Sequence, residues 1–288
     1  MVLESLITSK EAERSPGELF WYGILYSSVA IILGLWIFRD QASLVMVFLT
    51  VLAVIPLIFS TMKREERKTE VDHSESHLLK SHGRVLWYFM ALFLGMVVSF
   101  AVWYVFLPQA QVDSLFSTQI STIKSINSNF FRAIPLEGHF SNESIFVKIL
   151  SNNIKVMLFC LFFSFFYGAG AIFILTWNAS VIAGAAGSYI RSALASTASS
   201  FGLQSIAVYF GAFSVGIMRY LTHGSFEILA YFIGGLAGGI ISVAVIRHEL
   251  YARNLQRVFR DVAALMVVAM ILLVAGAIVE VYITPQIF

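Results

Sequence analysis

The sequence predicts an all-α polytopic membrane protein, a transmembrane helical bundle of about seven spans. Two observations predict this class. Of the 288 residues, 58% are hydrophobic and only 12% are charged, whereas soluble domains carry about 25% charged residues. Seven stretches are also apolar over roughly the 20 residues that a helix needs to cross a bilayer. The single cysteine, Cys160, excludes an internal disulfide and a cysteine-based metal site.

The first span has a typical helix start, because Ser15, Pro16 and Glu18 are a capping residue, a first-turn proline and an acidic residue of the first turn. The predicted spans are 20–38, 42–62, 85–107, 154–176, 206–221, 226–246 and 262–283. Together they divide the chain into an N-terminal two-span hairpin (1–62), a charged cytoplasmic loop (63–84) and a five-span core (85–288) with an outer connection at 108–151.

The segment 177–204 is rich in small residues and is apolar for only about a dozen residues before Arg191. It is therefore predicted to be a short re-entrant or interfacial helix on the inner side of the membrane.

Basic residues predict the orientation. Two connections hold Lys63, Arg64, Arg67, Lys68, Lys80 and Arg84, and Arg247, Arg253, Arg257 and Arg260. With both connections in the cytoplasm, together with Lys10, Arg14 and Arg191, most of the 19 basic residues lie inside, as the positive-inside rule requires. We therefore expect a multi-pass protein of the cell membrane, with a cytoplasmic N-terminus and an extracytoplasmic C-terminus.

Polar residues recur near the ends of the predicted spans. The candidate polar cluster consists of Asn152, Asn153, Arg219, His223, Glu227 and Glu280. Three of these residues are spaced by four and would share one helix face. The topology places the cluster at the outer ends of four spans, in a band about 5–10 Å deep.

Two interpretations of this cluster stay open. In the first, the groups only stabilise packing: the two asparagines cap the fourth span, Thr222 caps the sixth with Glu227 at its positive end, and Glu280 pairs with Arg219. In the second, the cluster is a binding site, in which Glu227 and Glu280 are acceptors bridged by His223 and offset by Arg219.

The sequence favours neither catalysis nor a metal site. His223 and Glu227 have the spacing of two ligands on one helix face, but zinc needs three protein ligands and only His139 among the other histidines could approach. No GxSxG motif or P-loop occurs. We expect no catalytic residue, no metal and no cofactor.

Two further segments predict contacts. Gly234, Gly235, Gly238 and Gly239 form overlapping GxxxG patterns, which favour close helix packing within the bundle or in a homo-oligomer. The basic segment 247–261 is suited to membrane lipid or a cytoplasmic partner.

Four short segments, taken in order, resemble the stage II sporulation protein M family over roughly residues 145–285. They are "ILSNNIKV", "WNASVIAG", "HGSFEI" and "IVEVYITP". The second of them makes Asn178 a further candidate residue. The chain departs from the family pattern at Thr222, where proline is usual, at Ala179, where glycine is common, and by the added residues 1–62. The resemblance implies a non-catalytic scaffold, since the best-known members hold cell-wall hydrolases at the membrane.

We therefore predict an integral membrane organiser that anchors other membrane or envelope proteins. The alternative is a transporter of a small solute, an ion or a lipid that uses the polar cluster, and an intramembrane enzyme comes third. Transporters usually bind substrate near the midplane of the bilayer, whereas the predicted cluster lies toward the outer face. No nucleic-acid partner is expected.

Overall fold

A computed structural model of the chain describes residues 16–71, 75–132, 142–164, 169–196, 203–246 and 252–287. These residues are almost entirely helical, and no strand occurs among them. The long helices are α2 (Pro16–Ile37), α3 (Ala42–Val71), α4 (Glu75–Phe106), α7 (Asn142–Phe163), α8 (Ala169–Ser196), α9 (Leu203–Ile246) and α10 (Ala252–Ile278). The shorter elements are η2 (Arg39–Gln41), α5 (Gln109–Leu115), α6 (Ser117–Arg132), the π-helical turn η3 (Val279–Ile283) and α11 (Thr284–Ile287). Seven helices of this part of the chain are long and apolar enough to cross a membrane, which confirms the predicted fold class.

Helix α9 corrects one part of the prediction. The predicted spans 206–221 and 226–246 belong to this single helix of 44 residues. The turn expected between them does not form, because the segment contains no proline and only one glycine, Gly224, which costs a helix about 1 kcal/mol. Thr222 does not cap a helix: its hydroxyl donates to the carbonyl oxygen of Met218, one turn earlier, at 2.6 Å.

Helix α8 corrects another part. Most of the segment 177–204, predicted to be re-entrant, lies in this continuous helix, whose stretch Ala171–Ala195 is itself a candidate span. The predicted span 154–176 is correspondingly divided between α7 and α8. Arg191 does not interrupt α8, because its guanidinium donates to the carbonyl oxygen of Leu107 at the end of α4.

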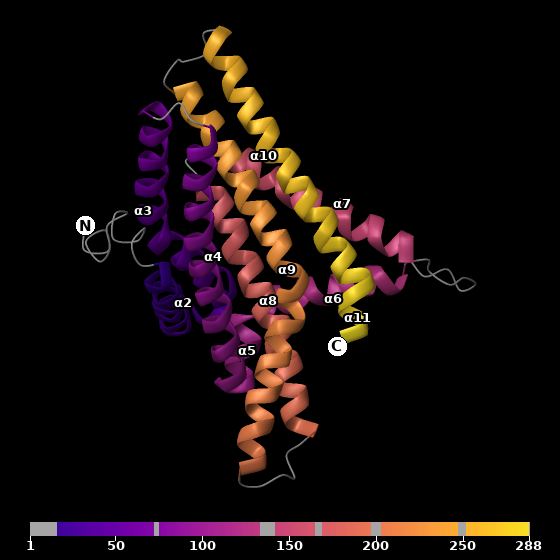
Figure 1. Cartoon of the computed structure of the whole chain (residues 1–288). Helices are drawn as coiled ribbons and strands as arrows, with labels where there is room; N and C mark the ends of the chain where they lie inside the picture. Colours follow the sequence, from indigo (N-terminus) through magenta and orange to yellow (C-terminus); the bar gives the residue numbers. More distant parts are fainter. Residues whose placement is uncertain are drawn as a thin grey trace.

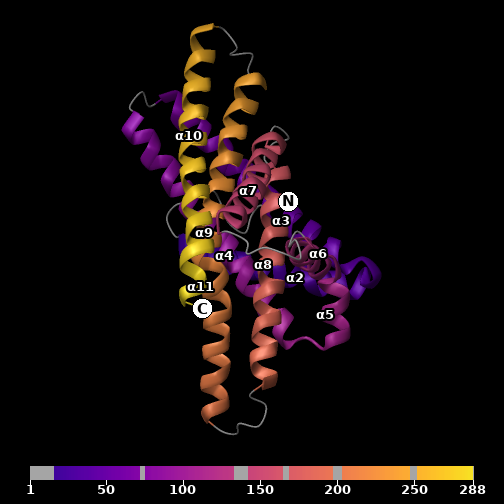
Figure 2. The ribbon, with the colours of Figure 1, turned by 90° about the vertical axis from the view of Figure 1, so that its right-hand side faces the viewer.

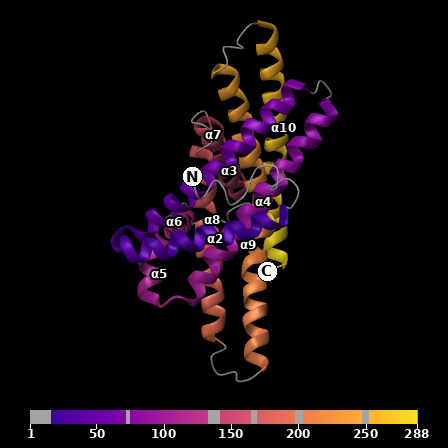
Figure 3. The ribbon, with the colours of Figure 1, turned by 90° about the vertical axis from the view of Figure 1, so that its left-hand side faces the viewer.

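The helices form an elongated bundle (Figure 1). α9 and α10 run side by side, and α8 and α9 form a second antiparallel pair that projects beyond the other helices. In the two views turned by 90°, the end of α9 and the start of α10 lie toward one end of the molecule, as do the end of α3 and the start of α4, and the end of α8 and the start of α9 lie at the other (Figures 2 and 3). Within the predicted loop 63–84, the described residues continue α3 and α4 as helix.

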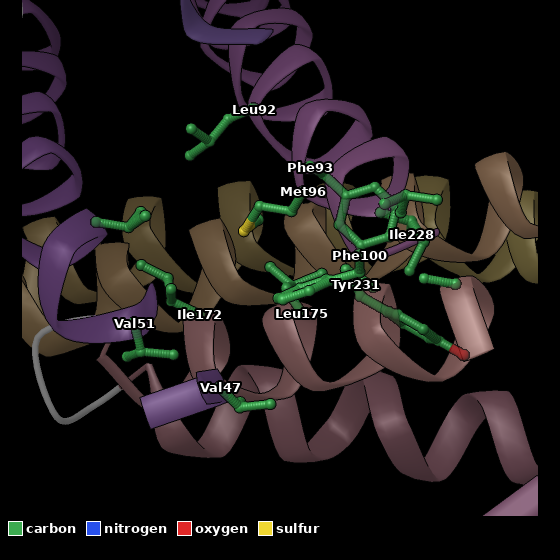
Figure 4. Close-up of a cluster of buried hydrophobic side chains, with 14 of the residues drawn as sticks. Val47, Val51, Leu92, Phe93, Met96, Phe100, Ile172, Leu175, Ile228 and Tyr231 are labelled. Carbon is green, nitrogen blue, oxygen red and sulfur yellow. The ribbon is translucent and has the colours of Figure 1, made fainter. Parts of the chain in front are cut away.

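The core lies where α4 crosses α8 and α9. Figure 4 shows Phe93, Met96 and Phe100 of α4 facing side chains of the other two helices, which include Leu175 and Ile228. All five are at most 3% exposed. Burial of this kind against other helices, rather than against lipid, fixes the arrangement of α4, α8 and α9 by packing.

The N-terminal hairpin is joined to the rest of the bundle by a close backbone crossing of α2 and α4. A Cβ atom added at Gly95 would overlap the carbonyl oxygen of Phe20, and one added at Gly23 would overlap the backbone of α4. Beside this crossing, the hydroxyls of Ser28 and Ser99 lie 3.0 Å apart. α2 is therefore a tightly packed member of the bundle.

The glycine-rich stretch of α9 packs within the chain. All four of its glycines are buried. A Cβ atom at Gly234 would lie 3.1 Å from the side chain of Met157, and one at Gly238 would overlap the carbonyl oxygen of Leu161 in α7. Of the two roles predicted for these glycines, packing inside the bundle is the one observed, and a homo-oligomer stays a prediction.

A buried hydrogen-bond network attaches α6 to the bundle. Gln119, which is fully buried, accepts from Ser43 of α3 at 2.7 Å and donates to Ser180 of α8 at 3.1 Å. One carboxamide thus joins three helices, and it places α6, in the predicted outer connection 108–151, against the end of the bundle.

We expect Gln119→Ala to lower the free energy of unfolding by about 1–3 kcal/mol, because it leaves two buried hydroxyls without this partner. Detergent-induced unfolding followed by tryptophan fluorescence measures the change. Ser121→Ala, on the exposed side of the same helix, is the matched control and should be neutral. Equal stability of the two variants would contradict the role given to Gln119.

Candidate functional site

The candidate site is built around Glu227, which lies in the interior of α9. The side chain of Asn153, on α7, donates through Nδ2 to Oε1 of Glu227 at 2.5 Å. The hydroxyl of Tyr231 donates to Oδ1 of the same asparagine at 3.0 Å. Asn153 is 5% exposed and Tyr231 is 3% exposed. Because both side chains are buried away from water, their polar groups need hydrogen-bond partners within the protein.

A second carboxyl group completes the site. Glu280 approaches Glu227 from the π-helical turn η3, so that two carboxyl groups lie close together in the site. π-helical turns of this kind are frequent at functional sites.

His223 lies one turn before Glu227 but has a different partner. Its Nδ1 is 3.5 Å from the hydroxyl of Thr284. That hydroxyl donates to the carbonyl oxygen of Val279 at 3.0 Å, so its remaining capacity toward the histidine is that of an acceptor. We assign a proton to Nδ1 of His223 on this basis. The expectation that His223 bridges the two glutamates was wrong.

Arg219 also lies apart from the carboxyl groups. Its guanidinium is 5.8 Å from the centre of the Tyr189 ring, a cation–π contact with α8. Glu280 contacts Glu227, so the expected pair of Glu280 with Arg219 is not the arrangement observed.

The two asparagines expected to cap a helix lie inside α7. Asn152 is exposed and Asn153 is buried, so only the second belongs to the site. Asn178, the further candidate, donates to the carbonyl oxygen of Ile174 in its own helix at 2.8 Å. The side chain of Asn178 is therefore hydrogen-bonded within its own helix, α8.

Two residues of the site lie near the middle of their candidate spans. The candidate span Asn142–Phe163 has its middle at residues 152–153, and Phe210–Ser242 has its middle at residue 226. A turn at residues 222–225 would have put Glu227 at a helix end, whereas in the continuous α9 it lies in the helix interior.

Within the described ranges, no three His, Cys, Asp or Glu side chains gather as metal ligands do. His139, the histidine considered as a third ligand, lies outside these ranges. What the described groups provide is a buried carboxyl pair, one carboxamide and one phenol.

Comparison with known proteins identifies the family of the chain. A family model described as stage II sporulation protein M matches residues 85–285, well over half of the chain. The chain belongs to this family. No curated protein and no solved structure matches it.

All residues of the site lie in the part that matches the stage II sporulation protein M family, while α2 and α3 precede it. The resemblance seen in the sequence is confirmed and extends back to α4. Two members of the site were missed. Tyr231 follows Glu227 by four residues, so the same helix spacing that grouped 219, 223 and 227 could have included it. The contact of Thr284 with the site depends on the π-helical turn, and no sequence pattern predicted that turn.

Proposed function

We propose that this protein is a membrane organiser that anchors other membrane or envelope proteins. The observation that carries the proposal is the projecting α8–α9 pair. Arg191 donates to Gln109 and to the carbonyl oxygens of Val105 and Leu107. It therefore lies level with the end of the candidate span Phe89–Phe106.

The part of α9 before Gly216 extends past that level. A Cβ atom at Gly216 would lie 2.8 Å from the side chain of Ile190, the neighbour of Arg191. Residues 203–215 therefore lie beyond the end of α4, over about 20 Å at 1.5 Å per residue. This length of helix is far from the buried core of α4, α8 and α9 (Figure 1).

The projecting surface has the character of a contact surface. No charged residue occurs between positions 192 and 218. Phe210 is 73% exposed and Val215 is 38% exposed. Exposed apolar side chains on a surface without charges favour contact with another protein.

The orientation that goes with this proposal keeps the N-terminus inside and the C-terminus outside. The described parts of both basic connections, in α3, α4 and α10, lie toward the end of the molecule opposite to the end of α8 and the start of α9 (Figure 3). The projecting pair is then extracytoplasmic, and Arg191 lies on the outer side, where the sequence had placed it inside. Lys10, Arg14 and Arg247 lie outside the described residues.

Site-specific photo-crosslinking tests the organiser role. A benzophenone amino acid at position 210 is expected to give an adduct with the extracytoplasmic part of an envelope or membrane protein, identified by mass spectrometry and confirmed from the partner's side. The matched control is the same amino acid at Phe159, which is 54% exposed on α7 and should react with lipid only. Lipid adducts alone at both positions would contradict the proposal.

Transport remains the second candidate, and one observation favours it. Glu227 and Asn153 lie near mid-span, as the binding sites of transporters do. Glu227→Gln keeps the size of the side chain and one acceptor oxygen, replaces the other oxygen by an amide donor, and removes the ability to ionise. A transporter would lose uptake in this variant while keeping normal abundance, whereas an organiser would keep its position 210 adduct.

A further inference from the structure

Residues near the end of the chain and at the start of α7 line a cavity of about 470 Å³ that is open to the surface. This is within the size range of sites for small organic ligands. Three apolar residues, Ile145, Ile149 and Val281, line it together with one acidic residue, Glu280. Among the described residues that line it, none is Lys, Arg or His.

Glu280 connects this cavity to the buried site. Glu280 lines the cavity and its side chain also interacts with Glu227. Asn142 and Gln286 add two carboxamides to the cavity wall, and each has an oxygen that can accept a hydrogen bond. Several acceptors thus surround an apolar space.

We propose that this cavity binds the primary ammonium group of an amphiphile, with Glu280 as its charged partner. A primary ammonium has three donors and no acceptor, which suits one carboxyl group flanked by two carboxamides. The hydrocarbon next to the ammonium group packs against Ile145 and Ile149. A lipid headgroup of the ethanolamine type and a free alkylamine present the same group, and both fit this chemistry.

Binding to the full-length protein tests the proposal in two arms. In the first, native mass spectrometry counts phosphatidylethanolamine retained by the protein, with phosphatidylcholine, which has no N–H donor, for comparison. In the second, hexylammonium is titrated against protein in lipid nanodiscs free of ethanolamine lipid, and thermal stability is followed. Retention in the first arm alone identifies the lipid headgroup, and stabilisation in the second identifies a free amine.

Three variants test whether binding takes place in this cavity. Glu280→Gln should weaken binding at least tenfold, and Ile149→Trp, which fills the cavity and leaves the carboxyl pair in place, should abolish it. Asp261→Asn, exposed near the other end of α10, is the control and should bind as the wild type does. Unchanged binding in Ile149→Trp, or no preference for a primary ammonium in either arm, would overturn the proposal. Neither outcome depends on the organiser role.

Discussion

Gly95→Ala is expected to lower the free energy of unfolding by about 3 kcal/mol, the upper end of the range for overpacked sites. The added methyl group meets the carbonyl oxygen of Phe20, which is backbone and cannot rotate away. α2 and α4 would have to move apart, and the contact between the hydroxyls of Ser28 and Ser99 would lengthen with them. Detergent-induced unfolding of the purified protein measures the loss.

The control for this experiment adds the same methyl group where there is room. Gly211 lies on the exposed side of α9, and a Cβ atom there has no neighbour within 4 Å. Gly211→Ala should leave stability unchanged or raise it by up to about 1 kcal/mol, since alanine is the better helix former. If the two variants unfold at the same detergent concentration, the close crossing of α2 and α4 is not present in the protein.

The second large effect concerns the buried site. We expect Asn153→Ala and Glu227→Ala each to cost about 1–3 kcal/mol, because each leaves a buried polar partner without its hydrogen bond. The double variant should cost less than the sum of the two by about 0.5–1.7 kcal/mol, as found for hydrogen bonds between membrane helices. A double-mutant cycle on unfolding free energies gives this coupling directly.

Arg219 supplies the comparison for that cycle. It lies two turns from Glu227, about 12 Å along the same helix, and it contacts Tyr189. The effects of Arg219→Ala and Glu227→Ala should therefore add within about 0.5 kcal/mol. Coupling between Arg219 and Glu227 that exceeds the coupling between Asn153 and Glu227 would restore the arrangement expected from the sequence, in which Arg219 offsets the charge of Glu227.

The fold class followed from the sequence because hydrophobic length is a physical requirement of the bilayer. Where charged residues separate two apolar runs, as between α2 and α3 and between α3 and α4, each predicted span falls in a helix of its own. The sequence failed at residues 219–227, where a short polar segment was taken for a turn. Polar side chains interrupt a hydropathy plot, but they do not interrupt a helix when a neighbouring helix supplies their hydrogen bonds.

The composition of the site was predicted better than its geometry. Asn153, Glu227 and Glu280 were all named as candidates, and the structure brings them together. Their depth could not be predicted, since it depends on whether α9 is one helix or two. The partners of His223 and Arg219 could not be predicted either, because Thr284 and Tyr189 belong to distant parts of the chain.

The continuity of α9 has a mechanical consequence. This helix of 44 residues contains no proline and extends from the end with the basic connections to the opposite end. The two halves of α9 run in different directions and meet near its middle (Figure 1). A tilt of one half by about 10° around this point displaces its end, about 33 Å away, by about 6 Å. Glu227 lies close to the middle of α9, so the buried carboxyl pair is near the pivot of any such tilt. A change in its hydrogen bonds would be transmitted to both faces of the membrane at once.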